Sequence, residues 1–90
     1  MRMRESTIER HLRFRVHHAG GLCVKFIPTA YAGFPDRIVL MPRAKITFVE
    51  LKAPGKKPTK LQLFVHEKLQ ALGFRVLVLD SIPAVDEWFS

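Results

Sequence analysis

The chain has 90 residues, enough for one core that buries about 60 to 65 % of the unfolded-chain surface and too few for a second domain, so we expect residues 1–90 to form a single domain. An apolar content of 48 % with 26 % charged residues is typical of a globular fold and excludes a disordered tail. Fifteen Lys and Arg against eight Asp and Glu give a net charge of +7, which favours a polyanionic partner, nucleic acid before membrane.

A first helix is expected from about Met3 to Ala19, because this segment lacks glycine and proline and Gly20-Gly21 follows it. An apolar stripe at helical spacing is expected to be buried: Ile8, Leu12, Val16 and Ala19. Glu5 projects near the middle of this stripe, at its amino-terminal end. It is either a solvated acid at the positive end of the helix dipole or an acid of a metal site. Glu9 lies on the flank and is expected to pair with Arg13 or to support site residues.

The segment from Leu22 to Ile27 alternates in polarity like a half-buried strand, and Pro28 ends it. The following loop, residues 29–34, leads directly towards Asp36 and could form one wall of a cleft. Tyr31 in this loop either stacks on a base or contacts a phosphate, or it is an exposed tyrosine without a role.

Two short strands, residues 37–41 and 46–51, are expected to form an antiparallel hairpin with its turn at residues 42–45. Such a hairpin would bring Asp36, before the first strand, next to Glu50, near the end of the second. A period of two residues puts Lys52 on the same face of its strand as Glu50. Two carboxylates and one ammonium group would then share a small volume.

This trio points to metal chemistry, because adjacent carboxylates repel one another unless a cation neutralises them. Carboxylate oxygens suit Mg²⁺ or Mn²⁺, and a nearby lysine can orient an attacking water or stabilise charge that develops on a phosphate. Gly33 lets the backbone approach closely, and Pro35 fixes the backbone just before Asp36.

The stretch after Lys52, residues 53–60, is rich in proline and glycine and is expected to be a loop. It carries Lys56, Lys57 and Lys60 close in sequence to the acid pair. These lysines are either solvated or bind backbone phosphates of DNA through sequence-independent electrostatics.

Thr59-x-x-Gln62 is a capping-box pattern, and the helix that it opens is expected to run to Leu72, before Gly73. Its expected buried stripe consists of Leu61, Val65, Leu69 and Leu72. Gln62 either caps the helix or faces the site, and one side chain cannot readily do both at once.

An apolar run from Val76 to Leu79 is typical of a strand covered on both faces. A short helix from Pro83 follows, and three of its side chains are expected to seal the core: Val85, Trp88 and Phe89. The order helix, three strands, helix, strand, helix predicts an α/β domain with a mixed sheet flanked by helices.

Pro35-Asp36 followed by Glu50-Leu51-Lys52 resembles the signature of PD-(D/E)xK nucleases. The longer pattern Gly33-x-Pro35-Asp36 resembles one family within that group. The entire chain is similar to the stand-alone virus-type replication-repair nuclease (VRR-NUC) domain of phages and bacteria. In that family a glutamate on the first helix precedes the acids, and a glutamine follows on the helix after the lysine strand. Glu5 and Gln62 stand in those places.

The resemblance implies a restriction-endonuclease-like core and a metal-dependent DNA endonuclease. Asp36 and Glu50 would bind one or two Mg²⁺ or Mn²⁺ ions, with the Leu51 carbonyl as a further ligand and Glu5 binding directly or through water. Lys52 would position the attacking hydroxide, and Gln62 would orient the lysine or the water. We expect DNA contacts from the following residues: Lys56, Lys57, Lys60, Tyr31 and Arg37.

Relatives of this minimal type act as homodimers on branched DNA, in the manner of Holliday junction resolvases, so the resemblance implies a dimer and a branched substrate, with no organic cofactor. No apolar run reaches the length of a membrane span, and the first five residues lack the apolar stretch of a signal peptide. The single cysteine, Cys23, agrees with a reducing compartment. We therefore expect a cytoplasmic protein of a bacterial or phage-infected cell, without membrane contact.

Other functions have weaker support in the sequence. The four histidines show no His-x-x-x-His spacing and Cys23 has no second cysteine, so a zinc site is not expected. Two alternatives remain open: a basic DNA-binding module on a nuclease fold that does not cut, and a small scaffold that recruits a protein partner. Retention of the three charged residues Asp36, Glu50 and Lys52 argues against the first.

Overall fold

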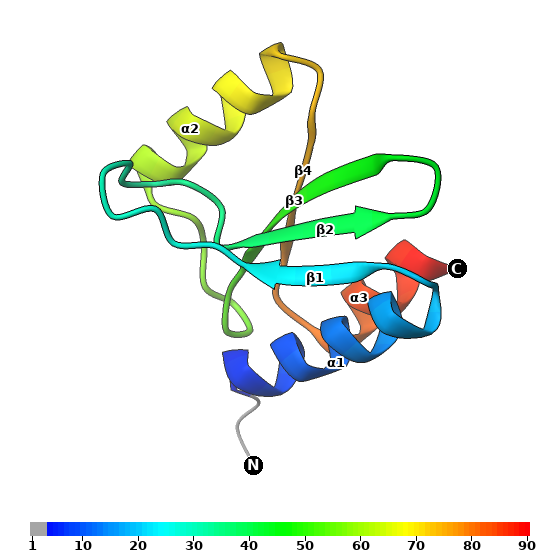
Figure 1. Cartoon of the computed structure of the whole chain (residues 1–90). Coiled ribbons are helices and arrows are strands. Elements are labelled where there is room, and N and C mark those ends of the chain that lie inside the picture. The colour runs from blue at the N-terminus through cyan, green and yellow to red at the C-terminus, as the bar shows by residue number, and fades with distance from the viewer. Residues whose placement is uncertain (1–3) are drawn as a thin grey trace.

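The structure is a computed structural model that describes residues 4–90. Its elements follow in the order α1 (Glu5–His18), β1 (Leu22–Lys25), β2 (Arg37–Met41), β3 (Lys45–Leu51), α2 (Lys60–Ala71), β4 (Arg75–Leu79) and α3 (Ile82–Phe89). The strands form one sheet in the order β1-β2-β3-β4, in which β3 and β4 are parallel and the other neighbours are antiparallel. Helices α1 and α3 lie together on one side of the sheet and α2 lies on the other (Figure 1). The predicted mixed α/β fold is confirmed.

The element boundaries differ slightly from those expected. The expected start of the first helix at Met3 lies outside the described residues. Strand β1 ends at Lys25 instead of Ile27, but the Phe26 N–H still donates to the Asp36 carbonyl over 3.0 Å. This last contact ties the end of β1 to the residue that opens the central hairpin.

The larger core lies between the sheet and the pair α1 and α3. Its fully buried members are Ile8, Leu12, Val16, Val39, Val49, Leu51, Leu79 and Val85. Ala19, expected in the same stripe, is exposed because it caps the end of α1. His11 Nε2 lies 2.6 Å from Asp86 Oδ1 and joins α1 to α3 by a polar contact.

A second, smaller core lies between the sheet and α2, where Phe48 packs against Val65 and Leu69. The expectation that Leu61 and Leu72 are buried is wrong, because their side chains are 50 % and 74 % exposed. Helix α2 is turned so that Val65, His66 and Leu69 are its buried residues. Apolar residues occur around most of this helix, so spacing alone did not identify the buried face.

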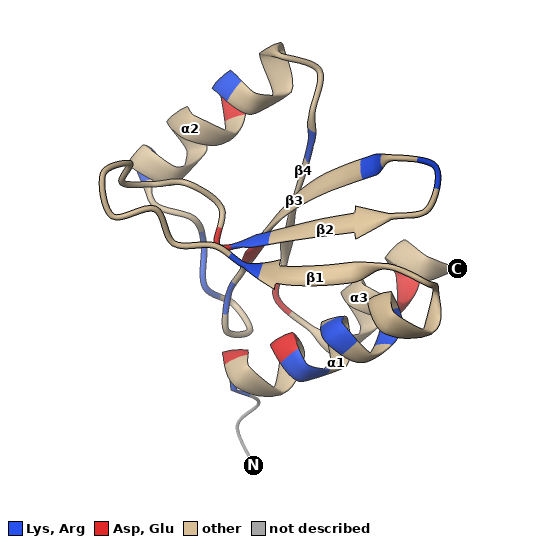
Figure 2. Ribbon diagram, in the orientation of Figure 1, with Lys and Arg blue, Asp and Glu red and all other residues tan. Residues whose placement is uncertain are grey.

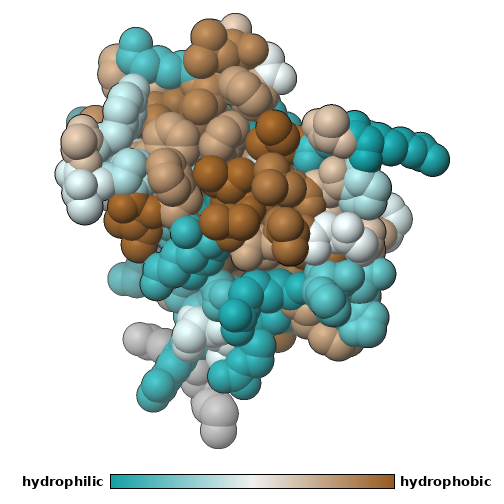
Figure 3. Space-filling model, viewed as in Figure 1, coloured by the Kyte–Doolittle hydropathy of each residue, from teal (hydrophilic) through white to brown (hydrophobic). Residues whose placement is uncertain are grey.

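Helix α2 leaves much of its side of the sheet uncovered. Four neighbouring strand residues are between 37 % and 64 % exposed there, and we call them the open sheet face: Leu22, Val24, Leu40 and Ile46. Figure 3 shows apolar side chains as one brown area that extends over the sheet and up to α2. No helix within residues 4–90 is long and apolar enough to cross a membrane.

Candidate active site

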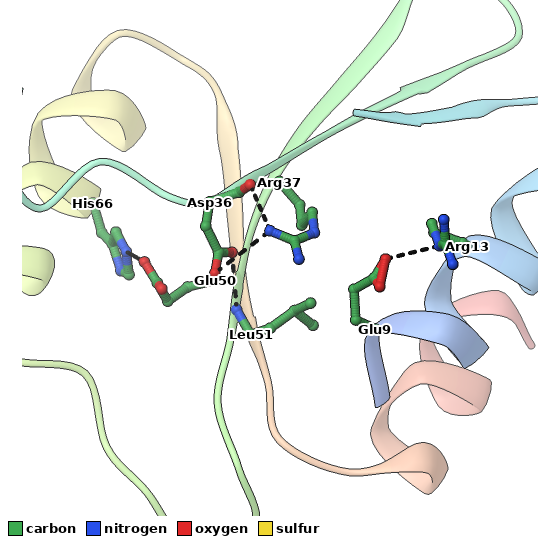
Figure 4. A network of polar contacts seen from close by, with 7 residues as sticks. All are labelled: Glu9, Arg13, Asp36, Arg37, Glu50, Leu51 and His66. Atoms are coloured by element: carbon green, nitrogen blue, oxygen red, sulfur yellow. Dashed lines mark hydrogen bonds and ion pairs between the residues drawn. The ribbon is translucent and has the colours of Figure 1, made fainter. Parts of the chain in front are cut away.

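Asp36 and Glu50 are brought together where β2 begins and β3 ends. The antiparallel register pairs Arg37 with Val49, and one step further it sets Asp36 opposite Glu50. The Leu51 backbone N–H donates to Asp36 Oδ1 over 3.4 Å, so the Asp36 side chain is anchored to β3 (Figure 4). The hairpin therefore gathers both predicted acids at one end of the sheet.

Burial makes the ionisation of both acids costly, and the charge of Asp36 adds to that cost at Glu50. Burial and the negative charge of Asp36 raise the pKa of Glu50 to about 7, and Lys52 acts in the opposite direction. Burial also raises the pKa of Asp36, whereas the Arg37 guanidinium opposes this rise. At neutral pH the pair holds two full negative charges readily only when a cation joins it.

Lys52 follows Glu50 by two residues and extends the pairing of β3 with β4, because its N–H donates to the Leu79 carbonyl over 3.1 Å. The Lys52 ammonium lowers the pKa of Asp36 and of Glu50, which places its charge within electrostatic reach of both carboxyl groups. The three predicted residues of the acid-and-lysine trio thus lie in one electrostatic neighbourhood.

Arg37, expected among the DNA-contacting residues, is 8 % exposed and lies inside the protein. Its Nη1 donates to the Asp36 carbonyl over 2.9 Å and lies 3.7 Å from Asp36 Oδ2. A buried guanidinium beside Asp36 balances part of the acid pair's charge. In this structure Arg37 acts on the site from within rather than facing a DNA backbone.

Helix α2 begins with the capping box that the sequence indicated. The Thr59 N–H donates to Gln62 Oε1 over 2.9 Å, and the Gln62 N–H donates to Thr59 Oγ1 over 3.1 Å. The Gln62 side chain is therefore engaged at the helix end and contacts neither Lys52 nor the acids through a hydrogen bond.

One turn further along α2, His66 faces Glu50 instead. His66 Nε2 lies 3.5 Å from Glu50 Oε1, and both side chains are at least 95 % buried (Figure 4). Within residues 4–90, neither of these two atoms has a hydrogen-bond partner of good geometry. Burial, with a further contribution from Lys52, lowers the pKa of His66, so the imidazole is neutral at pH 7.

The two acids of α1 differ in their surroundings. Glu9 Oε1 lies 2.8 Å from Arg13 Nε, which confirms the predicted pairing four residues apart. Glu5 is exposed, and its negative charge contributes to the raised pKa of Glu50. Glu5 is thus the α1 acid whose charge acts on Glu50.

Lys56 and Lys57 are exposed in the loop after β3, which leaves the sheet beside the acids (Figure 2). Lys60, expected in the same loop, is exposed but is the first residue of α2. Tyr31 is 49 % exposed and packs edge-on against Phe34, with ring centroids 5.8 Å apart. Tyr31 thus contacts Phe34, which packs against Phe48 and the core beneath α2.

The residues at this end of the sheet fit a hard divalent cation. Two carboxylates and the Leu51 carbonyl offer oxygen donors, the kind that Mg²⁺ and Mn²⁺ prefer. Glu50 is 3 % exposed and its pKa is raised by burial and by the charge of Asp36, so a cation at this end of the sheet would offset a charge that is costly to hold there. No three His, Cys, Asp or Glu side chains of the described chain cluster as a ligand set, so water and phosphate would complete the coordination.

A mixed sheet that sets an aspartate against a Glu-x-Lys strand end defines a nuclease-type α/β domain. No family model matches the chain. It is 49 % identical over 90 residues to the "Putative nuclease p44" of Acyrthosiphon pisum secondary endosymbiont phage 1, a match that covers 93 % of this chain and 97 % of that protein. A solved VRR_NUC domain superposes with a TM-score of 0.89 at 34 % identity, covering 94 % of this chain and 92 % of that one. The chain belongs to the VRR-NUC family of nucleases.

The sequence did not indicate His66 or the buried position of Arg37. A signal for His66 existed, because it stands four residues after Gln62 and next to the buried Val65, so it shares a helix face with an expected site residue. Arg37 is the first residue of a strand with alternating burial, which placed its side chain on the same inward face as Val39.

Proposed function

We propose that this nuclease is a metal-dependent DNA endonuclease that uses Mg²⁺ or Mn²⁺. The observation that carries the proposal is the acid pair at the end of the hairpin: Asp36 lies opposite Glu50, burial raises the pKa of both carboxyl groups, and the charge of Asp36 raises the pKa of Glu50 further. Buried carboxyl groups with raised pKa values occur mainly at functional sites, where a bound cation stabilises their charged forms.

The residues would divide the work as follows. Asp36, Glu50 and the Leu51 carbonyl hold the cation, which supplies Lewis acidity and an activated water when bound. Lys52 positions the attacking water and stabilises negative charge that develops on the scissile phosphate. Glu5 acts through a water from the start of α1. Gln62 orients Lys52 or the water only if its side chain leaves the Thr59 amide.

DNA binding would rest on charge. Lys56, Lys57 and Lys60 are exposed and follow Lys52 within eight residues of the chain, so they would contact backbone phosphates near the cut. Tyr31 could stack on a base exposed in a branched substrate. The net charge of +7 favours association with DNA of any sequence.

The family resemblance favours a homodimer acting on branched DNA in the manner of a Holliday junction resolvase. Two copies would supply two cuts on symmetrically related strands. The open sheet face suits a second copy, because its four contiguous apolar residues continue towards the exposed apolar side chains of α2, and an apolar surface of this extent marks an interface.

Sedimentation of the wild-type chain is expected to show a dimer, and Leu40→Glu is expected to dissociate it. Phe14→Glu is the matched control, because Phe14 is also an exposed apolar residue, 56 % accessible, but lies on α1 on the other side of the sheet. A monomeric wild type, or a dimer unaffected by Leu40→Glu, contradicts this part of the proposal.

Cleavage of labelled four-way junctions, flaps and linear duplexes, with and without Mn²⁺, tests the function. We expect Mn²⁺-dependent cleavage of junctions above duplex by the wild type and none by Glu50→Gln. Equal nicking of linear duplex would remove the resolvase specificity. DNA binding without cleavage by either protein would indicate a non-catalytic DNA-binding module instead.

A further inference from the structure

Histidine 66 is the one buried polar side chain that α2 brings to the sheet. The residue is 4 % exposed and lies between Val65 and Leu69, which are core residues of the same helix face. A polar ring at such a position is costly unless it has a partner. The polar atom that faces its Nε2 is Glu50 Oε1, 3.5 Å away.

This contact joins two atoms that each need a partner. Both His66 Nε2 and Glu50 Oε1 are inaccessible to solvent, and within residues 4–90 neither has another hydrogen-bond partner. A distance of 3.5 Å leaves no room for a water between them and needs only a small movement to become a hydrogen bond. A hydrogen bond from His66 Nε2–H to Glu50 Oε1 would therefore satisfy both atoms at once.

We propose that His66 is a positioning residue of the metal site, whose Nε2–H holds Glu50 Oε1 and leaves Oε2 to bind the cation. The inference rests on the proposed function, because it assigns His66 a role only if Glu50 binds metal. A carboxylate that ligates a metal is commonly fixed by a hydrogen bond from a neighbouring group, and loss of such a group typically weakens metal binding by about 10- to 100-fold.

The surrounding structure supports a fixed position for His66. The loop before Asp36 packs against the start of α2, where a Cβ on Gly33 would come within 2.8 Å of Leu61 Cγ and 3.1 Å of Val65 Cγ2. The capping box fixes the first turn of the helix as well. Helix α2 thus packs on the Gly33 loop through Leu61 and Val65 and on Phe48 of the hairpin through Val65 and Leu69, so the imidazole meets Glu50 in a defined geometry.

Mn²⁺ affinity, measured by the electron paramagnetic resonance signal of free Mn²⁺, tests the inference without relying on cleavage. His66→Phe keeps a ring in the core and removes the N–H, and it is expected to weaken Mn²⁺ binding by about 10- to 100-fold. His66→Gln offers an amide N–H at similar reach and is expected to restore much of the affinity. His17→Phe, at an exposed histidine of α1, is the control and is expected to bind like the wild type.

A second arm separates positioning from a general packing role. In a Glu50→Gln background, His66→Phe is expected to cause no further loss of Mn²⁺ affinity, because His66 acts through Glu50. An equal additional loss in that background overturns the inference. Nitrogen-14 hyperfine coupling on the bound Mn²⁺ that disappears in His66→Gln also overturns it, because it would make His66 a direct ligand.

The outcomes for the inference and for the proposed function are distinct. A wild type that binds no Mn²⁺ overturns both. A wild type that binds Mn²⁺ while folded His66→Phe binds equally well overturns the positioning role alone. If circular dichroism shows that His66→Phe is unfolded, His66→Asn replaces it, since its shorter amide does not reach Glu50 and the same loss of affinity is expected.

Discussion

The backbone N–H of Leu51 donates to the Oδ1 atom of Asp36 over 3.4 Å, so a main-chain group of one strand fixes a side chain of its hairpin partner. The residue that donates this bond also carries the carbonyl proposed as a metal ligand. The orientation of Asp36 therefore depends on the pairing of β2 with β3, and the site forms when the hairpin forms. Two core residues, Val39 and Val49, hold that hairpin against α1.

Asp36→Asn is expected to abolish cleavage while preserving the fold. The amide oxygen can still accept the Leu51 hydrogen bond, but the charge that binds a cation is lost. We expect the rate with saturating Mn²⁺ to fall by at least about 100-fold, since metal binding supplies several kcal/mol of transition-state stabilisation. Cleavage assays together with thermal melting check this, and a variant that cuts at the wild-type rate would contradict the assignment of Asp36.

The raised pKa of Glu50 predicts that metal-free protein loses stability as the pH rises. The folded-state pKa of about 7 lies above the ordinary carboxyl value, so between these values the folded protein binds more protons than the unfolded chain. The stabilising effect of this proton is present at pH 5 and is lost through pH 7, by up to about 3 kcal/mol.

Glu50→Gln isolates this effect in chemical denaturation experiments at pH 5 and pH 8. The lowered pKa of His66 acts in the opposite direction, because the unfolded chain then gains protons more readily below pH 6.5. The contribution of His66 is largely the same in both proteins, so most of it cancels when their unfolding free energies are compared. We expect Glu50→Gln to be more stable relative to the wild type at pH 8 than at pH 5. A difference that does not change with pH would contradict a protonated Glu50.

Lys52→Met is expected to separate catalysis from metal binding. Lys52 lies near both carboxyl groups but offers no ligand atom while it is charged, so its proposed role is in the attack on phosphate. We expect cleavage to fall by about 100-fold or more, with the Mn²⁺ dissociation constant changed by less than about 10-fold. Single-turnover cleavage at saturating Mn²⁺ and direct Mn²⁺ titration measure the two effects, and Lys52→Arg serves as the charge-conserving comparison.

Much of the fold was predictable because local signals agreed with the tertiary structure. The stripe of Ile8, Leu12 and Val16 is fully buried, and the alternation in residues 37–41 gave the strand. The packing of α2 was not predictable, because two different helix faces fit the spacing of a buried stripe. One face contains Leu61, Val65 and Leu69, and the face that is buried contains Val65, His66 and Leu69. Which face is buried depends on the contact with Gly33 and Phe48, residues far from α2 in the sequence.

Part of the candidate site could likewise be predicted from the sequence, and part could not. Asp36, Glu50 and Lys52 were predictable, because a hairpin with period two fixes which residues meet. The contact of His66 with Glu50 joins residues 16 positions apart across two layers of the fold, and no local pattern specifies it. Only the three-dimensional packing of α2 on β3 reveals that pair.

Lys56 and Lys57 are expected to bind phosphates, so the double variant Lys56→Gln/Lys57→Gln should bind DNA with a shallower salt dependence. Each lost phosphate contact reduces the slope of log K against log salt by about 0.9, or about 1.8 for both. Arg43→Gln/Lys45→Gln removes the same charge from the turn at the far end of the hairpin and is the control (Figure 2). Equal slopes for the two double variants, measured by fluorescence anisotropy, would show that only net charge matters.

Gly33→Ala is expected to disturb the site by displacing α2. Gly33 has a φ of +87°, which costs an alanine about 1 kcal/mol, and its added Cβ would lie 2.8 Å from Leu61 Cγ and 3.0 Å from the Leu61 carbonyl. Gly73→Ala is the matched control, because Gly73 has a φ of +96° but open space around its Cβ position. It carries a similar backbone cost without a collision.

Both variants should therefore lose stability in thermal melting, but only Gly33→Ala should also weaken Mn²⁺ binding and cleavage. The reason is that a shift of Leu61 and Val65 also moves His66, the residue after Val65 in α2, away from Glu50. If Gly73→Ala lowers Mn²⁺ affinity as much as Gly33→Ala, the loss follows from reduced stability, and the packing of the Gly33 loop on α2 does not control the site.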